Sequence, residues 1–250
     1  MASVKKSLEL LGAFSLRSPN WTLAGLSRHL GFPKSTAHNL LKTLQSFDLV
    51  RQNPRDRTYR LGPRAMEMGL VFARSTGMLS DARPVLRRLA GKSGETVKLG
   101  ILSGDHVLII AAVESAHQLH TRGDAGTRWP LHSSGLGKAI LSAMPPMEAH
   151  ALVGRHGLKR YTNRTVTSWP KLRADLVCIR QRGYALDLEE NEPGVRCVAA
   201  AFVDPLREAV VALSISGPSL RLADNDLKTL ANDVIAAARS IRPQAHWEEL

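Results

Sequence analysis

The fold of the N-terminal part is decided by LSRHLGFPKSTAHNLLKTLQSF, residues 26–47. Gly31 interrupts this stretch, and glycine readily adopts the left-handed turn that follows a helix. Pro33 then suits the first turn of the next helix. In that helix the apolar positions fall at helical spacing: Ala37, Leu40, Leu41 and Leu44. The stretch therefore predicts two helices joined by a glycine turn, the second with one buried face.

The residues on both sides extend this pair of helices. An amphipathic first helix is predicted by the helical spacing of Val4, Leu8, Leu11 and Phe14. Thr22 is suited to cap the second helix. Downstream, residues 49–51 and 57–61 predict two short strands around the polar turn 53–56. Helices followed by a basic hairpin are the pattern of a winged helix-turn-helix.

The polar face of the helix that begins at Pro33 predicts DNA binding. Recognition helices use hydrogen-bonding and cationic side chains on base edges and phosphates, and a basic wing follows the backbone or the minor groove. Tyr59 either touches DNA or packs inward. An ordinary solvated helix face is the alternative, which the preceding helix and glycine turn disfavour. The candidate DNA contacts are Thr22, Lys34, Ser35, Thr36, His38, Asn39, Lys42, Arg51, Arg57, Tyr59 and Arg60.

The charge distribution agrees with a polyanionic partner. The 250 residues carry a net charge of +12, and residues 1–63 hold ten lysines and arginines against three acids. A dense positive field of this kind attracts DNA. Charge alone also fits RNA, a membrane surface or a generally basic solvated surface.

Length and composition indicate a folded protein with more than one domain. Hydrophobic residues make up 44% of the 250 residues, which suits a globular core. Apolar runs stay short of the roughly 18 residues that span a bilayer, and no apolar signal-peptide segment follows Met1. Two cysteines, Cys178 and Cys197, fit a reducing compartment. We therefore expect a cytoplasmic protein with no membrane partner.

The rest of the chain predicts a linker and a second domain. Gly62-Pro63 ends the first domain, residues 1–63, and residues 64–80 predict a linker helix that either packs on its own protein or dimerises. In residues 81–250, strands paired as hairpins and flanked by helices predict an α+β domain around an antiparallel sheet. The expected helices cover 81–90, 135–143, 169–182 and 224–242, and the expected strands cover 97–102, 107–114, 184–189, 195–203 and 210–216.

Several motifs follow one another in a recognisable order. They are TLAGLSRHLGFPKST (22–36), YRLG (59–62), PLHSSGLGKA (130–139), GYALDLEE (183–190), GVRCVAA (194–200) and SISGP (214–218). Through these motifs the chain resembles the IclR family of bacterial transcriptional regulators along nearly its whole length. The resemblance implies an α+β protein with a winged helix-turn-helix, a linker helix and a C-terminal GAF-like domain.

The same resemblance implies partners. Members are dimers or tetramers that repress or activate catabolic operons in response to small organic or aromatic acids. We therefore expect double-stranded operator DNA, a small organic acid and further copies of the chain as partners, with no cofactor and no metal. The positions that match the family's effector contacts are Trp129, Gly135, Leu136, Asp187, Val195, Cys197, Ser214 and Ser216.

Physical arguments support this effector site, and each has an alternative. Ser134 is suited to cap a helix whose first N–H groups, at Gly135 and Leu136, would face an anion. Gly135 could instead serve only close packing, Cys197 could be an inert thiol, and Asp187 could pair with Arg196. Ser214 and Ser216 could satisfy backbone groups. Residues 118–122 are expected to close over the site, and Trp129 with a scarcity of buried cations hints at a partly apolar acid.

Enzymatic and RNA-binding functions are the rival classes. Residues 132–139 resemble a phosphate loop, but His132 replaces its first glycine and Ala139 its last hydroxyl residue. A Cys197–His132 pair has no supporting spacing. The spacing of His117 and His120 is a weak metal signal, and solvated histidines are preferred. We therefore expect a regulator rather than an enzyme.

Overall fold

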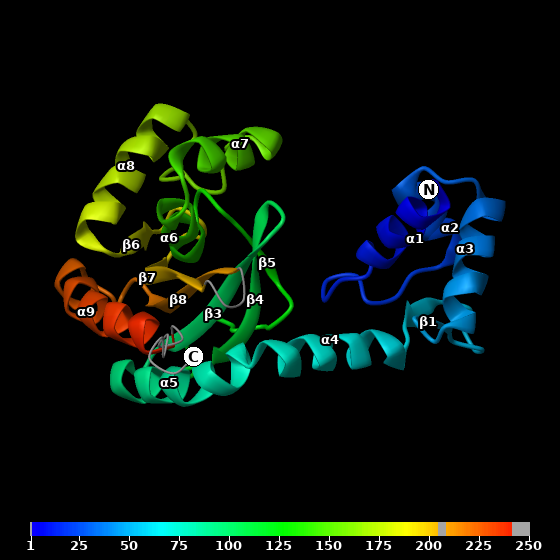
Figure 1. Cartoon of the computed structure of the whole chain (residues 1–250), viewed down its shortest axis with the longest axis horizontal. Helices are drawn as coiled ribbons and strands as arrows, with labels where there is room; N and C mark the ends of the chain where they lie inside the picture. Colours follow the sequence, from blue (N-terminus) through cyan, green and yellow to red (C-terminus); the bar gives the residue numbers. More distant parts are fainter. Residues whose placement is uncertain (1, 205–208, 242–250) are drawn as a thin grey trace, which may run out of the picture. The chain divides into compact units, whose positions relative to one another are not determined.

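The chain forms two compact units, residues 1–77 and 78–250, in the computed structural model (Figure 1). The structure describes residues 2–204 and 209–241. Within these ranges, the helices are all too short or too polar to cross a membrane. The first unit includes the helix that the sequence predicts as a linker, and this helix ends at Gly77 in the left-handed conformation.

The first unit has the expected order of elements. Gly31 ends the second helix with φ of 67°, and the Thr22 hydroxyl accepts a hydrogen bond from the Gly25 N–H (3.0 Å). Leu26, Leu41 and Val50 are fully buried in its core. The elements are α1 (Ala2–Gly12), α2 (Leu23–Leu30), α3 (Lys34–Ser46), β1 (Val50–Gln52), β2 (Tyr59–Leu61) and α4 (Pro63–Thr76).

Two details of the first unit differ from the expectation or decide between alternatives. Val4 and Leu8 are exposed rather than buried, because α1 turns Leu10 inward and ends at Gly12, so that Phe14 enters the core from beyond the helix. Tyr59 is only 4% exposed and packs in the same core. Its N–H and carbonyl both pair with Trp21, which fixes the base of the hairpin.

The second unit is built on an antiparallel sheet of strand order β5-β4-β3-β8-β7-β6. This confirms the predicted α+β class. The sequence did not predict β5 and α7, and Ser168 precedes α8 without a side-chain capping bond. Residue 242, at the end of the last predicted helix, lies outside the described ranges. The elements are α5 (Met78–Ser93), β3 (Thr96–Ser103), β4 (His106–Val113), β5 (Arg128–Pro130), α6 (Gly135–Ala143), α7 (Pro146–His156), α8 (Trp169–Arg182), β6 (Ala185–Leu188), β7 (Val195–Asp204), β8 (Ala209–Pro218) and α9 (Asp224–Ile241).

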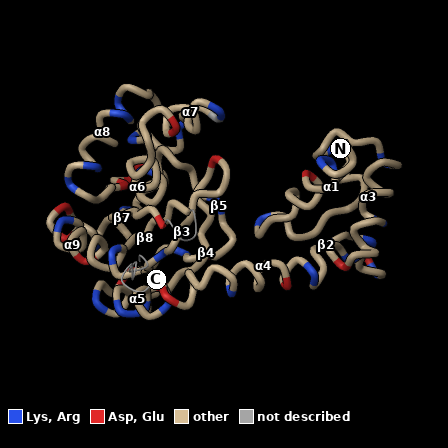
Figure 2. Tube along the Cα trace, viewed as in Figure 1, with Lys and Arg blue, Asp and Glu red and all other residues tan. Residues whose placement is uncertain are grey.

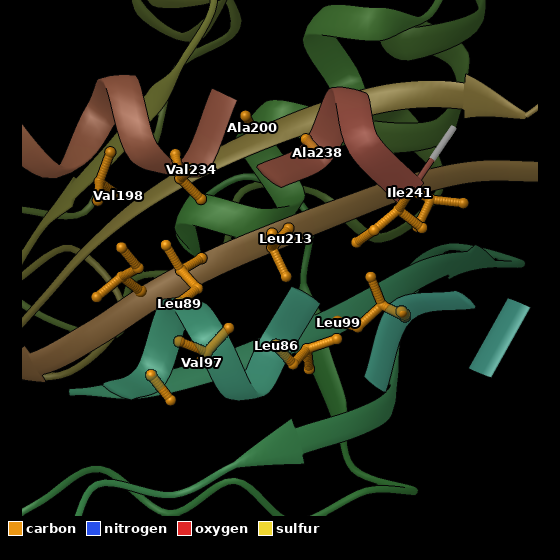
Figure 3. Packing of buried hydrophobic residues seen from close by; sticks show 14 of the residues in the cluster. Leu86, Leu89, Val97, Leu99, Val198, Ala200, Leu213, Val234, Ala238 and Ile241 are labelled. Atoms are coloured by element: carbon orange, nitrogen blue, oxygen red, sulfur yellow. The ribbon is translucent and has the colours of Figure 1, made fainter. Parts of the chain in front are cut away.

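The two faces of this sheet have different chemistry. Helices α5 and α9 cover one face with an apolar core that includes Leu86, Val97, Leu99, Leu213 and Val234 (Figure 3). Helix α6 packs on the other face and α8 packs against α6, and the apolar cluster on this side is smaller. Because side chains alternate along a strand, the polar residues between the apolar ones point toward α6.

Candidate DNA-binding surface and effector site

The outer face of α3 exposes most of the predicted DNA contacts. Lys34, Ser35, His38, Asn39 and Lys42 are exposed, whereas Thr36 is half-buried. Pro33 precedes the helix without a side-chain capping bond, so the first N–H groups of α3 are not used by a cap. Free N–H groups at a helix start favour an anion such as a phosphate.

The β1–β2 hairpin presents arginines at the edge of the same unit. Arg57 and Arg60 are exposed, and Arg51 forms a surface ion pair with Asp48 at 3.1 Å. Figure 2 marks these and the other charged residues along the chain. The turn is held by Asp56, whose carboxylate accepts bonds from the Thr58 N–H and hydroxyl. Basic side chains therefore extend from a braced hairpin.

Two of the predicted DNA contacts, Tyr59 and Thr22, have a structural role in the first unit. Tyr59 lies in the core, so it packs inward and is not a candidate DNA contact. The Thr22 hydroxyl caps α2, although the residue is exposed. Thr22 thus stabilises the start of α2, and this role is separate from its predicted contact with DNA.

Helix α4 has an apolar surface that the described residues of its own unit leave exposed. None of its residues is buried. Met66 is 70% exposed, and Met68, Leu70, Val71 and Phe72 are also exposed. Exposed apolar surface of this kind is typical of a surface that contacts another molecule.

In the second unit the predicted effector residues converge near the start of α6. Ser134 caps this helix, because its hydroxyl accepts the Gly137 N–H (3.1 Å) and donates to the Pro130 carbonyl (2.6 Å). The first N–H groups of the helix, those of Gly135 and Leu136, have no acceptor within it. A Cβ on Gly135 would lie 2.8 Å from the Cys197 sulfur. Close packing is therefore one role of Gly135, as the alternative held.

Strand pairing brings the remaining residues together. Cys197 pairs with Asp187 on one side and with Ser216 on the other. Ser214 lies two residues from Ser216 on the same face of β8. Val195, at the start of β7, is half-buried and pairs with Pro218. The sheet thus places on adjacent strands residues that are 10 positions apart in the sequence (Asp187 and Cys197) and 19 positions apart (Cys197 and Ser216).

Asp187 is an acidic group held in a buried site. Its Oδ1 accepts hydrogen bonds from the N–H groups of Glu190 (2.8 Å) and Asn191 (3.3 Å). Burial raises the pKa of Asp187 to about 7. The alternative of an Asp187–Arg196 pair is wrong, because Arg196 binds Asp224 at 2.8 Å and approaches Glu189 at 3.9 Å.

Cys197 is a neutral wall of the site. Burial raises the pKa of its thiol to about 12, so the reactive thiolate is disfavoured. The His132 ring bonds the Lys159 carbonyl through Nε2 at 2.8 Å. These two residues therefore do not form the base-activated thiol of a cysteine nucleophile.

The two serines of β8 differ in their partners. Ser216 approaches the Thr121 hydroxyl at 3.0 Å and donates to the Thr96 carbonyl at 3.4 Å, so it satisfies local groups, as its alternative held. The Ser214 hydroxyl is buried beside the Cys197 thiol, and it makes no hydrogen bond of good geometry within the described residues. Among the described residues, Ser214 therefore retains a hydroxyl group without a full hydrogen bond.

Lys98 is the residue of this site that the sequence did not predict. It lies on β3, paired with Ser214, and is 2% exposed. Its Nζ lies 4.3 Å from the centre of the Trp129 ring, which brings Trp129 into the site. The signal was a single cation inside the apolar strand 97–102. The expected scarcity of buried cations is wrong, because both Lys98 and Lys138 are buried.

The segment that follows β4 borders the site. The Thr121 hydroxyl donates to the Ser216 carbonyl at 3.1 Å, and the Thr121 carbonyl accepts from Thr96 at 2.8 Å. The predicted closing loop, residues 118–122, thus touches the edge of the site. In the described part of the chain, histidines, cysteines and acids do not group as metal ligands.

Comparison with known families agrees with this arrangement. Residues 3–54 match the IclR helix-turn-helix domain, and residues 72–242 match the bacterial transcriptional regulator IclR C-terminal domain. The chain belongs to the IclR family of transcriptional regulators.

Individual relatives cover nearly the whole chain. The HTH-type transcriptional regulator BhcR of Paracoccus denitrificans is 38% identical over 96% of this chain and 85% of its own. The acetate operon repressor of Salmonella typhimurium is 37% identical over 96% and 88%. Both are regulators rather than enzymes, as the sequence led us to expect.

Solved structures share the fold. A protein from Silicibacter sp. TM1040 assigned to the IclR regulators superposes with a TM-score of 0.88 at 28% identity, over 96% of this chain and 94% of that one. An IclR homologue from Microbacterium hydrocarbonoxydans, complexed with 4-hydroxybenzoate, has a TM-score of 0.81 at 22% identity, over 96% and 97%. The latter likeness shows the fold alone.

Proposed function

We propose that this chain is an effector-responsive repressor that binds a double-stranded operator with its first unit and a small organic acid with its second. The observation that carries the proposal is the presence of two polar sites, one exposed and one buried. One is the exposed cationic face of α3 and the hairpin, and the other is the buried donor-rich site at the start of α6. Catabolic genes are the proposed targets.

The DNA contacts divide into two groups by chemistry. Ser35, Thr36, His38 and Asn39 offer hydrogen bonds to base edges, which gives sequence preference. Lys34, Lys42, Arg51, Arg57 and Arg60 offer cations to phosphates, which gives salt-dependent affinity. The α3 helix would thus read the major groove while the hairpin follows the backbone.

A second copy of the chain is the proposed occupant of the apolar face of α4. Recognition helices commonly act in symmetric pairs on pseudo-palindromic sites. The exposed Met66, Leu70 and Val71 supply an apolar surface for such a pair. Two dimers could associate further into a tetramer.

The effector is proposed to bind among Trp129, Gly135, Asp187, Cys197 and Ser214. Helix N-termini and hydroxyl donors favour a carboxylate. Bound acid would shift the dimer between a state that fits the operator and one that does not, by as much as its affinities for the two states differ. The neighbour that holds 4-hydroxybenzoate provides one acid for a first panel.

The DNA part of the proposal is tested by selecting binders from a random duplex library and measuring affinity for the selected duplex against salt. Lys34→Ala and Arg60→Ala should each lower the salt slope by about 0.9, which corresponds to one phosphate contact. Lys171→Ala, an exposed lysine on α8, is the matched control and should leave the slope unchanged. Selection of no duplex, or tighter binding to an RNA of the same sequence, would contradict an operator-binding function.

A further inference from the structure

Two buried lysines of the second unit differ in their partners. Lys98 and Lys138 are each 2% exposed. Lys138 Nζ donates to Glu190 at 2.5 Å and to Asp175 at 2.9 Å. Lys98 Nζ has no hydrogen-bond partner within the described residues. A buried cation without a partner is unfavourable, so Lys98 lacks the counter-ion that Lys138 has.

Three groups beside Lys98 are unsuited to be that counter-ion. The Trp129 ring attracts a cation through its π face, at 4.3 Å from Nζ, but it accepts no full hydrogen bond. Ser214, the strand neighbour, has a buried hydroxyl that lies beside the Cys197 thiol and makes no hydrogen bond of good geometry in the described part of the chain. Cys197 is a neutral thiol because burial raises its pKa to about 12. These three groups therefore give Lys98 no anionic partner.

Ionisable groups act on Lys98 from several elements. They are Cys197 on β7, Glu192 in the turn between β6 and β7, Asp124 in the segment after β4, and Asp187 on β6. None of them is a hydrogen-bond partner of Nζ. Burial lowers the pKa of Lys98, and these groups only partly oppose that effect.

We propose that Lys98 is the counter-ion of the effector: its ammonium group donates a hydrogen bond to a carboxylate oxygen of a small acid bound between β3, β8 and the start of α6. The inference rests on the proposed function, since it assigns a role within the proposed acid site. The Ser214 hydroxyl and the first N–H groups of α6 are the further donors. Lys98 thereby selects an anion over a neutral molecule of the same shape.

Proton uptake is a consequence of this pairing. Without an acid, burial favours the neutral amine of Lys98, and a bound carboxylate favours the ammonium form. The pKa of Lys98 is therefore lower before binding than after it. Acid affinity should be highest at low pH and should fall as pH rises through the pKa of the unliganded site. One proton is taken up for each acid bound in that range.

Titration calorimetry tests the pairing on the full chain. The probes are pyruvate, glycolate and 4-hydroxybenzoate, each compared with its neutral amide. We expect at least one acid to bind the wild type about 10- to 100-fold more tightly than its amide, the range of a charge-assisted hydrogen bond. Repeating the titration at several pH values above about 8, in buffers of different protonation heat, counts the protons where Asp187, with a pKa of about 7, is already ionised.

Two substitutions at the same position separate charge from structure. Lys98→Met keeps an unbranched side chain that is one atom shorter and carries no charge, and it should abolish both the preference for the acid and the proton uptake. Lys98→Arg keeps a permanent charge, so it should retain the preference for the acid but take up no proton. Lys171→Met on α8 is the matched control and should behave as the wild type. Thermal unfolding verifies that each variant is folded.

The outcomes distinguish this inference from the proposed function. Acid binding by the wild type with equal affinity in Lys98→Met and no proton uptake would overturn the role of Lys98 and leave the effector function intact. Binding of no probe acid by the wild type would overturn both. Loss of proton uptake in Lys98→Arg with the acid preference retained would support the counter-ion directly.

Discussion

The two units carry their candidate functional side chains in opposite ways. In the first unit these side chains lie outside a small apolar core, on α3 and the hairpin. In the second unit Lys98, Asp187, Cys197 and Ser214 are buried in one face of a sheet. Substitutions in the first unit should therefore change binding with little effect on stability. Those in the second should change binding, and their effect on stability should depend on whether the buried polar group has a partner.

The largest expected effect comes from the paired buried lysine. Lys138→Met should lower the free energy of unfolding by about 3 to 5 kcal/mol, because it leaves the carboxylate of Glu190 buried without its cation. Lys98→Met removes a cation without a partner and should leave that free energy unchanged or raise it. Urea denaturation of the two variants at neutral pH measures both. Equal losses would show that the two sites do not differ.

A smaller effect is expected from the acid of the buried site. The pKa of Asp187, about 7, lies above its unfolded value, so the folded chain binds this proton more tightly. The contribution of Asp187 to the free energy of unfolding should be greatest below about pH 4, and it should fall by up to about 4 kcal/mol as pH rises to about 7.

Asp187→Asn isolates this contribution. The amide keeps an oxygen for the Glu190 and Asn191 N–H groups but does not titrate in this range. Between about pH 4 and 7 the wild type should therefore lose stability relative to the variant, and above about pH 7 the difference between them should stay constant. A difference independent of pH would contradict the raised pKa.

The smallest effect is expected in the first unit. Thr22→Ala removes the cap of α2 and should cost about 1 kcal/mol. Hydrogen exchange of the α2 amides should accordingly become about fivefold faster. Thr43→Ala is the matched control, since the Thr43 hydroxyl bonds the Asn39 carbonyl inside α3, where such bonds add little. A similar change in both variants would argue against a special role of the cap.

Local sequence signals were sufficient for the first unit. Gly31, Pro33 and Thr22 act within a few residues of their positions, and the apolar spacing of Ala37, Leu41 and Leu44 follows from helix geometry. The exception was α1. Helical spacing favoured Val4 and Leu8, but the chain turns Leu10 inward, and only packing against the rest of the core decides which face is buried.

For the second unit, the resemblance to the family predicted the effector positions. Which other side chains these residues contact depends on the register of the strands. Sequence alone left open whether Asp187 pairs with Arg196, and the structure directs Arg196 to Asp224 instead. Lys98 was read as part of an apolar strand, because its chemistry depends on Trp129 and Ser214, which are distant in the sequence.

The amino-acid sequence by itself therefore determined the winged helix-turn-helix, the α+β class and the family, since these rest on short-range periodicity, turn residues and ordered motifs. Only the tertiary structure decided which polar groups are buried and which of them are paired. The physical reason is that burial and pairing depend on contacts across the sheet and with α6. Such contacts join residues whose separation along the chain carries no local signal.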